Sequence, residues 1–194
     1  MPQPENLLVV FFGMVATGKS YLASAWANHY NMPYYNSDRV RKELAGLSPE
    51  ADQKEEVDHG IYTPEFSRRT YDALIEHAAH HFNANKKACV VLDGSYQARE
   101  ERDLLRKLFG NQVRIVFVHC FCSEKVVRKR LDIRASDPDA VSDGNWKIYL
   151  SQKERFQPVT ETEQVLELDS DAPLGDLMKK VTSEIAPVMS GKPA

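Results

Sequence analysis

The sequence predicts one α/β domain in which a parallel sheet lies between layers of helices. Short apolar runs alternate with segments of helical periodicity along the chain, a pattern typical of right-handed β-α-β units. The first apolar run ends in the glycine-rich segment GMVATGKS, and a helix-like segment follows it. The 194 residues suffice for one substantial core, and no linker rich in proline, glycine or serine divides them. We therefore expect a single domain over 1–194.

The first elements are a buried strand and a helix. Leu7–Phe12 is continuously apolar, as in a strand of a parallel sheet that is covered on both faces. The helix-like run Lys19–Tyr30 follows, and Met32–Asn36 reads as a short second strand. Ser37–Leu44 has a helical pattern, with Ser37 as the candidate N-cap.

The middle of the chain begins with a weakly patterned segment. Residues 45–62 are polar and acidic, and we expect a mobile connection there. Thr63 and Pro64 are a typical helix start, a capping residue followed by proline at the first helical position, and the helix should reach about Asn83. Ala88–Leu92 is the third strand.

The remaining elements continue the alternation. The expected order is a helix, the fourth strand, a strongly charged helix, another helix, the last strand, the last helix and a loose tail. In the same order, these elements span Arg99–Phe109, Val113–Cys122, Glu124 to about Ala135 with Ser123 as its cap, near Ser142 to before Pro158, Val165–Leu168, Leu174–Met189 and 190–194.

The glycine-rich segment fits the pattern G-x-x-x-x-G-K-[ST] in full. Glycines let the backbone curl so that its N–H groups point at phosphate oxygens, and the next helix adds the positive end of its dipole. Lys19 can reach the β- and γ-phosphates, and the Ser20 hydroxyl can bind Mg²⁺ (magnesium). The segment therefore predicts a nucleoside triphosphate site. Its residues are Gly13, Met14, Val15, Ala16, Thr17, Gly18, Lys19 and Ser20.

Two acidic residues follow strands and should meet this site, because ligands of open α/β sheets bind beyond the carboxyl ends of the strands. Asp93 ends the third strand and either holds Mg²⁺ or caps the next turn. Asp38 follows the second strand and either takes a proton from the acceptor hydroxyl or is an ordinary acid of a first helical turn. Arg41 lies three residues after Asp38, on the same face of the expected helix, and either binds an anionic acceptor or pairs with Asp38.

A basic helix carries two arginines that are four residues apart, Arg130 and Arg134, and so are neighbours on one face. One guanidinium can stack on a purine base, and the other can neutralise charge on the phosphoryl group in transfer. Tyr96 and Arg99, in the loop after Asp93, are possible acceptor contacts, although no signal distinguishes them.

The order of these motifs resembles the small P-loop kinases related to gluconate, shikimate and nucleoside monophosphate kinases, and more narrowly the AAA_33 group of zeta-toxin and polynucleotide-kinase-like proteins. The segments are GMVATGKS, SDRVRKEL, VVLDGSY, RLDIR and SDGNWKIY, within residues 7–170. The acceptor motifs of gluconate and shikimate kinases are not evident.

The resemblance implies a P-loop NTPase sandwich with a five-stranded parallel sheet in the order 2-3-1-4-5, and ATP with Mg²⁺ as cofactors. It also implies that Arg130 stacks near the adenine, that Arg134 touches phosphates as part of the catalytic set with Lys19 and Asp38, and that residues 134–143 form a lid. The acceptor-side segment would be 45–62.

We therefore expect an ATP-dependent kinase that phosphorylates a hydroxyl group of a small molecule. Two alternatives remain, a regulatory ATPase module and a 5′-hydroxyl polynucleotide kinase. The net charge of −3 argues against a nucleic-acid partner. No apolar run has the length of about 20 residues that spans a bilayer. A cytoplasmic protein is expected, while the acceptor and the oligomeric state are open.

Overall fold

The computed structural model describes residues 6–48, 59–85, 87–135 and 144–189. Most of the expected acceptor-side segment 45–62, most of the expected lid 134–143 and the tail 190–194 lie outside these ranges. Within the described part of the chain, no helix is both long and apolar enough to cross a membrane.

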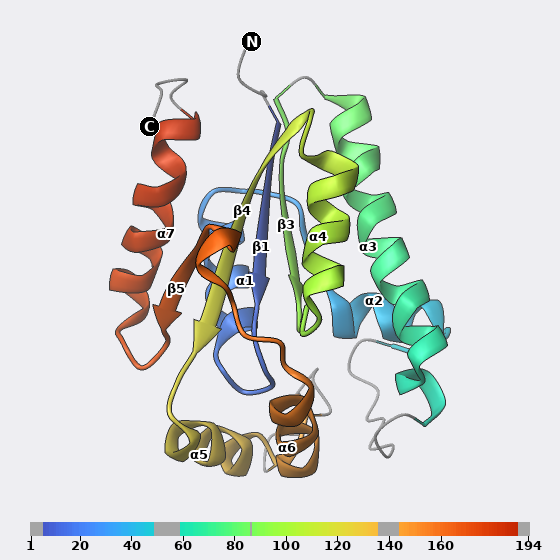
Figure 1. The fold of residues 1–194 in the computed structure, drawn as a ribbon, viewed down its shortest axis with the longest axis vertical. Coiled ribbons are helices and arrows are strands. Elements are labelled where there is room, and N and C mark those ends of the chain that lie inside the picture. Colours follow the sequence, from blue (N-terminus) through green and yellow to red (C-terminus); the bar gives the residue numbers. More distant parts are fainter. Residues whose placement is uncertain (1–5, 49–58, 86, 136–143, 190–194) are drawn as a thin grey trace.

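The described residues form a five-stranded, all-parallel sheet in the order β2-β3-β1-β4-β5 (Figure 1). This confirms the predicted fold class and strand order. Each predicted strand is present, with ends that differ by a few residues. The strands are β1 (Asn6–Phe12), β2 (Tyr34–Asn36), β3 (Cys89–Gly94), β4 (Val113–Phe121) and β5 (Val165–Asp169).

Helices follow the strands as the periodicity predicts. The Thr63 hydroxyl accepts from the Phe66 amide at 3.3 Å, which confirms this cap. The expected cap at Ser37 is wrong: Asn36 caps the helix instead, because its Oδ1 accepts from the amides of Asp38 and Arg39. The helices are α1 (Lys19–His29), α2 (Ser37–Leu44), α3 (Pro64–Ala84), α4 (Arg99–Phe109), α5 (Glu124–Arg134), α6 (Trp146–Arg155) and α7 (Leu174–Met189), with short 3₁₀ turns η1 (Gly60–Tyr62) and η2 (Glu161–Glu163).

The helix that was expected to begin near Ser142 begins at Trp146 in the structure, while Ser142 itself lies outside the described residues. Asn145 is its N-cap, and the Asn145 Oδ1 accepts from the Ile148 amide at 3.1 Å. The residue in the sequence that marks the start of this helix is therefore Asn145, directly before Trp146.

Side chains of β1 alternate between two apolar layers, as the period of two in a strand requires. Leu7, Val9 and Phe11 pack with α1 and α7, whereas Leu8, Val10 and Phe12 pack with α3 and α4. Burial of one such side chain contributes roughly 1.5–3 kcal/mol, so the two layers hold the sheet between its helices.

A third apolar cluster lies beyond the carboxyl ends of the strands. Val15 and Ala16, which follow β1, pack there against Val127 and Leu131 of α5 and Tyr149 of α6. Figure 1 shows α5 and α6 side by side below the arrowheads of the sheet. This cluster brings two helices from the second half of the chain onto the glycine-rich loop.

Candidate active site

The site is centred on the Gly13–Ser20 loop, which leads from β1 into α1. Gly13 has a φ of 143° and Gly18 a φ of 81°, conformations that side chains other than glycine rarely adopt. A Cβ on Gly13 would lie 2.3 Å from the carbonyl oxygen of Cys120, so β4 passes too close for any side chain. Both glycines are thus required by the path of the backbone.

Inside the loop, the Met14 carbonyl accepts more than one hydrogen bond. The Met14 carbonyl accepts from the Thr17 hydroxyl at 2.8 Å and from the Lys19 Nζ at 3.4 Å. The Lys19 ammonium therefore lies against the loop itself, at the start of α1. This is the position from which a lysine can meet phosphates that the loop amides bind.

Asp93 is fully buried next to the loop, at the end of β3. Its Oδ2 accepts from the Asn36 Nδ2 at 2.6 Å and from the Tyr34 hydroxyl at 2.7 Å. Burial, and then the charge of Asp93, raise the pKa of Tyr34 far above its usual range, so this hydroxyl stays protonated and donates. The Asn36 Nδ2 also lies 3.5 Å from the Ser20 Oγ, which joins the carboxylate to the loop.

The Asp93–Ser20 pair has the chemistry of a magnesium site. The second carboxylate oxygen, Oδ1, is buried and has no hydrogen-bond partner among the described residues. A carboxylate oxygen and a serine hydroxyl, both linked to the Asn36 amide, are hard oxygen ligands of the kind that Mg²⁺ prefers. The described residues contain no cluster of three or more His, Cys, Asp or Glu side chains that could hold a metal ion.

Arg130 is fixed beside the loop by four hydrogen bonds, one of them from its Nη1 to the Cys122 Sγ at 3.5 Å. Its Nη2 donates to the Ser170 carbonyl at 2.7 Å, and its Nη1 donates to the Ser170 hydroxyl at 2.9 Å and to the Ala16 carbonyl at 3.3 Å. The planar guanidinium thus has one orientation, which suits a plate on which a base could stack.

A pocket of about 500 Å³ opens next to this guanidinium. It lies between the start of α1, the helix α5 and the loop from β5 to α7, and its walls are mainly apolar. Arg134 lines it together with Arg130, as the four-residue spacing predicted. The lining residues are Ala16, Gly18, Tyr21, Leu22, Arg130, Ile133, Arg134, Ser170, Asp171, Ala172, Leu174 and Leu177.

Asp38 lies in the first turn of α2, two residues beyond Asn36, and its side chain is partly exposed. Arg41 is buried and does not pair with Asp38 in the described part of the chain. Its Nη1 donates to the Ile61 carbonyl at 2.7 Å and to the Ser67 hydroxyl at 3.1 Å, and its guanidinium lies over the Tyr62 ring. Arg41 thus ties α2 to η1 and α3.

The two expected acceptor contacts, Tyr96 and Arg99, both follow β3. Tyr96 has a positive φ of 40°, is 2% exposed and packs edge-on against the Tyr71 ring. Arg99 is exposed on α4 and pairs with Asp103. The structure adds Asn36 and Tyr34, which hold Asp93. The rule that strand ends meet at one edge, applied to the last residue of β2, could have found Asn36.

A protein-family model matches most of the chain. The model of the AAA_33 family, described as an AAA domain, matches residues 8–159. The search of curated proteins gave no match.

Solved structures share the whole fold at low sequence identity. A sugar kinase from Janibacter sp. HTCC2649 superposes with a TM-score of 0.72 at 16% identity, over 97% of this chain and 99% of that one. A gluconokinase from Sinorhizobium meliloti 1021 gives 0.63 at 20% identity, over 96% and 94%. The APS kinase of Mycobacterium tuberculosis, in complex with AMPPNP and APS, gives 0.64 at 17% identity, over 94% and 99%.

Proposed function

The chain belongs to the AAA_33 family, and we propose that it is an ATP-dependent kinase that transfers the γ-phosphate to a hydroxyl group of a small molecule. The observation that carries the proposal is the contact between the Gly13–Ser20 loop and the buried carboxylate of Asp93, through Asn36 and Ser20. A phosphate cradle beside an oxygen ligand set is what a triphosphate with a divalent ion requires. The structural neighbours named above are a sugar kinase, a gluconokinase and an APS kinase, which supports the proposal.

Each group has a defined task in this proposal. The loop amides and Lys19 bind the β- and γ-phosphates, and the guanidinium of Arg130 packs on the base in the pocket beside it. Mg²⁺, when bound at Asp93 and Ser20, neutralises phosphate charge. Arg134 lines the same pocket and stabilises the charge that develops on the phosphoryl group in transfer.

Asp38 is proposed as the group that accepts the hydroxyl proton. It stands on the first turn of α2, directly after the strand whose last residue binds Asp93, so it lies at the same edge of the sheet. A carboxylate with partial exposure and no described side-chain partner is free to meet an acceptor hydroxyl.

The experiment is ATP turnover with a panel of sugars, nucleosides, aminoglycosides and 5′-hydroxyl oligonucleotides, with mass spectrometry of the products. We expect a phosphorylated small molecule. ATP hydrolysis that a protein partner stimulates, without such a product, would support the regulatory ATPase. Phosphorylated oligonucleotides, formed with a steep salt dependence, would support the polynucleotide kinase.

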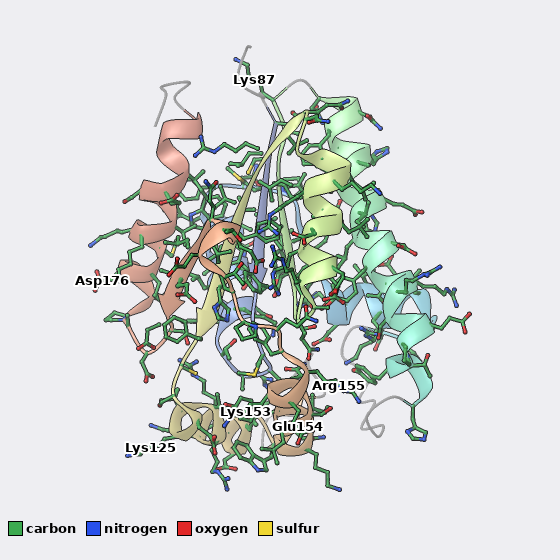
Figure 2. All side chains as sticks on the ribbon, in the orientation of Figure 1. Lys87, Lys125, Lys153, Glu154, Arg155 and Asp176 are labelled. Carbon is green, nitrogen blue, oxygen red and sulfur yellow. The ribbon has the colours of Figure 1, made fainter. Side chains whose placement is uncertain are left out.

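The Asp38→Asn variant tests the proposed base. Transfer should fall by about 10²–10⁴-fold while ATP affinity is kept, because the amide retains the shape of the carboxylate but accepts no proton. Asp176→Asn is the matched control, since Asp176 lies on the outer side of α7 and its side chain is exposed (Figure 2). Full activity of Asp38→Asn would remove Asp38 from the mechanism.

A further inference from the structure

A side chain of α6 contacts the backbone of the Gly13–Ser20 loop. The Oε1 of Gln152 accepts from the Val15 amide at 2.6 Å, across 137 residues of sequence. The amide can only donate, so the oxygen end of the Gln152 side chain must face it. Tyr149, one turn earlier on the same helix, is buried in the cluster that contains Val15. The hydrogen bond between Gln152 and Val15 is therefore part of a packed interface between α6 and the Gly13–Ser20 loop.

The Val15 N–H belongs to the peptide whose carbonyl is that of Met14. On its carbonyl side this peptide accepts from the Lys19 Nζ at 3.4 Å and from the Thr17 hydroxyl at 2.8 Å. Because a peptide group is planar, an acceptor that holds the N–H also fixes the direction of the C=O. Gln152 and Lys19 thus act on the same rigid unit from its two ends.

The helix that carries Gln152 is itself anchored on two sides. Its Lys153 bonds to Glu124 of α5 at 2.9 Å. Directly after it, the Gln157 amide donates to the Gln97 carbonyl at 3.0 Å, and the Gln157 Oε1 accepts from the Arg99 amide at 2.6 Å. Gln152 therefore projects from a support that is tied both to α5 and to the loop after β3.

We propose that Gln152 is a positioning residue, which holds the Met14–Val15 peptide in the orientation that places the ammonium of Lys19 for the β- and γ-phosphates. This inference rests on the proposed function, because the phosphate contacts of Lys19 are part of it. Gln152 acts through the peptide and needs no contact with the nucleotide.

The test replaces Gln152 by methionine, which has similar length and no strong acceptor. Affinity for ATP should fall about tenfold in calorimetry, the size expected for a buried N–H that loses its partner. AMP carries neither a β- nor a γ-phosphate, so its affinity should stay at the wild-type value. The matched control is Glu154→Met on the same helix, where the side chain is exposed (Figure 2); it should change neither affinity.

The amide proton of Val15 gives a direct spectroscopic readout. It should move upfield in the ¹⁵N-labelled Gln152→Met variant, because the short hydrogen bond is lost. Gln152→Asn, whose amide is one methylene too short to reach Val15, should repeat the loss of ATP affinity and serves as the second variant if the methionine variant does not fold.

The outcomes separate the two proposals. If the wild-type protein binds no ATP, the proposed function fails. If it binds ATP and Gln152→Met keeps that affinity, or loses AMP affinity to the same degree, the positioning role of Gln152 is wrong.

Discussion

Asn36 and Asp93 are register partners on the neighbouring strands β2 and β3, and the Nδ2 of Asn36 donates to the Oδ2 of Asp93 at 2.6 Å. The same asparagine caps α2 through its Oδ1. One side chain thus sets the start of the helix that carries Asp38 and the orientation of the buried carboxylate.

Asp93→Asn should separate activity from stability. The amide oxygen still accepts from Tyr34 and Asn36, while the loss of a buried charge offsets the burial of an amide NH₂ group. The free energy of unfolding should therefore stay within roughly 1 kcal/mol of wild type. ATP turnover should fall at least about a hundredfold, because the variant lacks the carboxylate that is proposed to bind Mg²⁺. Urea unfolding measures the stability, and a magnesium titration measures the turnover. If the variant retained the wild-type dependence on magnesium, the proposed role of Asp93 as a Mg²⁺ ligand would be wrong.

Gly13→Ala should destabilise the protein by roughly 3 kcal/mol or more, because the added Cβ meets the Cys120 carbonyl and the φ of 143° is unfavourable for alanine. Gly175→Ala is the control: it lies in α7, and a Cβ there meets nothing within 4 Å. The control should be neutral or slightly stabilising. Thermal unfolding compares the two, and equal melting temperatures would show that the loop relaxes around the methyl group.

Arg130→Lys should weaken ATP binding about tenfold or more, since an ammonium cannot reproduce the planar fork that holds Ser170. Arg128→Lys is the matched control on the same helix; Arg128 is exposed and its guanidinium lies over the Trp146 ring. Calorimetric titration with ATP decides. Equal affinities for the two variants would mean that the orientation of Arg130 is not needed for the nucleotide.

Glu163 should make stability depend on pH in the acid range. The hydrogen bond from Arg102, opposed by burial, lowers the pKa of Glu163 from 4.5 to about 2. A depressed carboxyl pKa stabilises the fold above the unfolded-state value of about 4.5, and this contribution disappears as the pH falls toward 2. It amounts to roughly 3 kcal/mol at neutral pH.

Glu163→Gln measures this contribution. The variant should be less stable than wild type in urea at about pH 6, and the difference should shrink at about pH 3. A difference that is independent of pH would show that packing, rather than charge, is what the variant loses.

The fold and the Gly13–Ser20 loop could be predicted because their signals are local. An apolar run such as Leu7–Phe12 identifies a buried strand without reference to the rest of the chain, and the loop pattern is contiguous. Partners that only the fold brings together could not be found in this way. Gln152 meets Val15 across 137 residues, and Asn36 meets Asp93 across 57.

Tyr96 and Arg99 show that a position just after a strand does not determine whether a side chain is buried or exposed. Both residues follow β3, at the edge formed by the carboxyl ends of the strands. The direction of each side chain, however, depends on the local backbone conformation. The Tyr96 ring is buried, whereas Arg99 begins α4 and is exposed. No residue pattern in this loop predicts that Tyr96 is buried or that Arg99 is exposed.

The buried Arg102–Glu163 pair has a kinetic consequence. Arg102 also donates to the carbonyls of Tyr96, Gln97 and Gln157, so it closes a ring of segments up to 61 residues apart. Contacts of such separation form only after the chain has closed long loops, and the loss of a contact that forms after the transition state accelerates unfolding more than it slows folding. We therefore expect the lifetime of the native state, more than the speed of its formation, to depend on this pair.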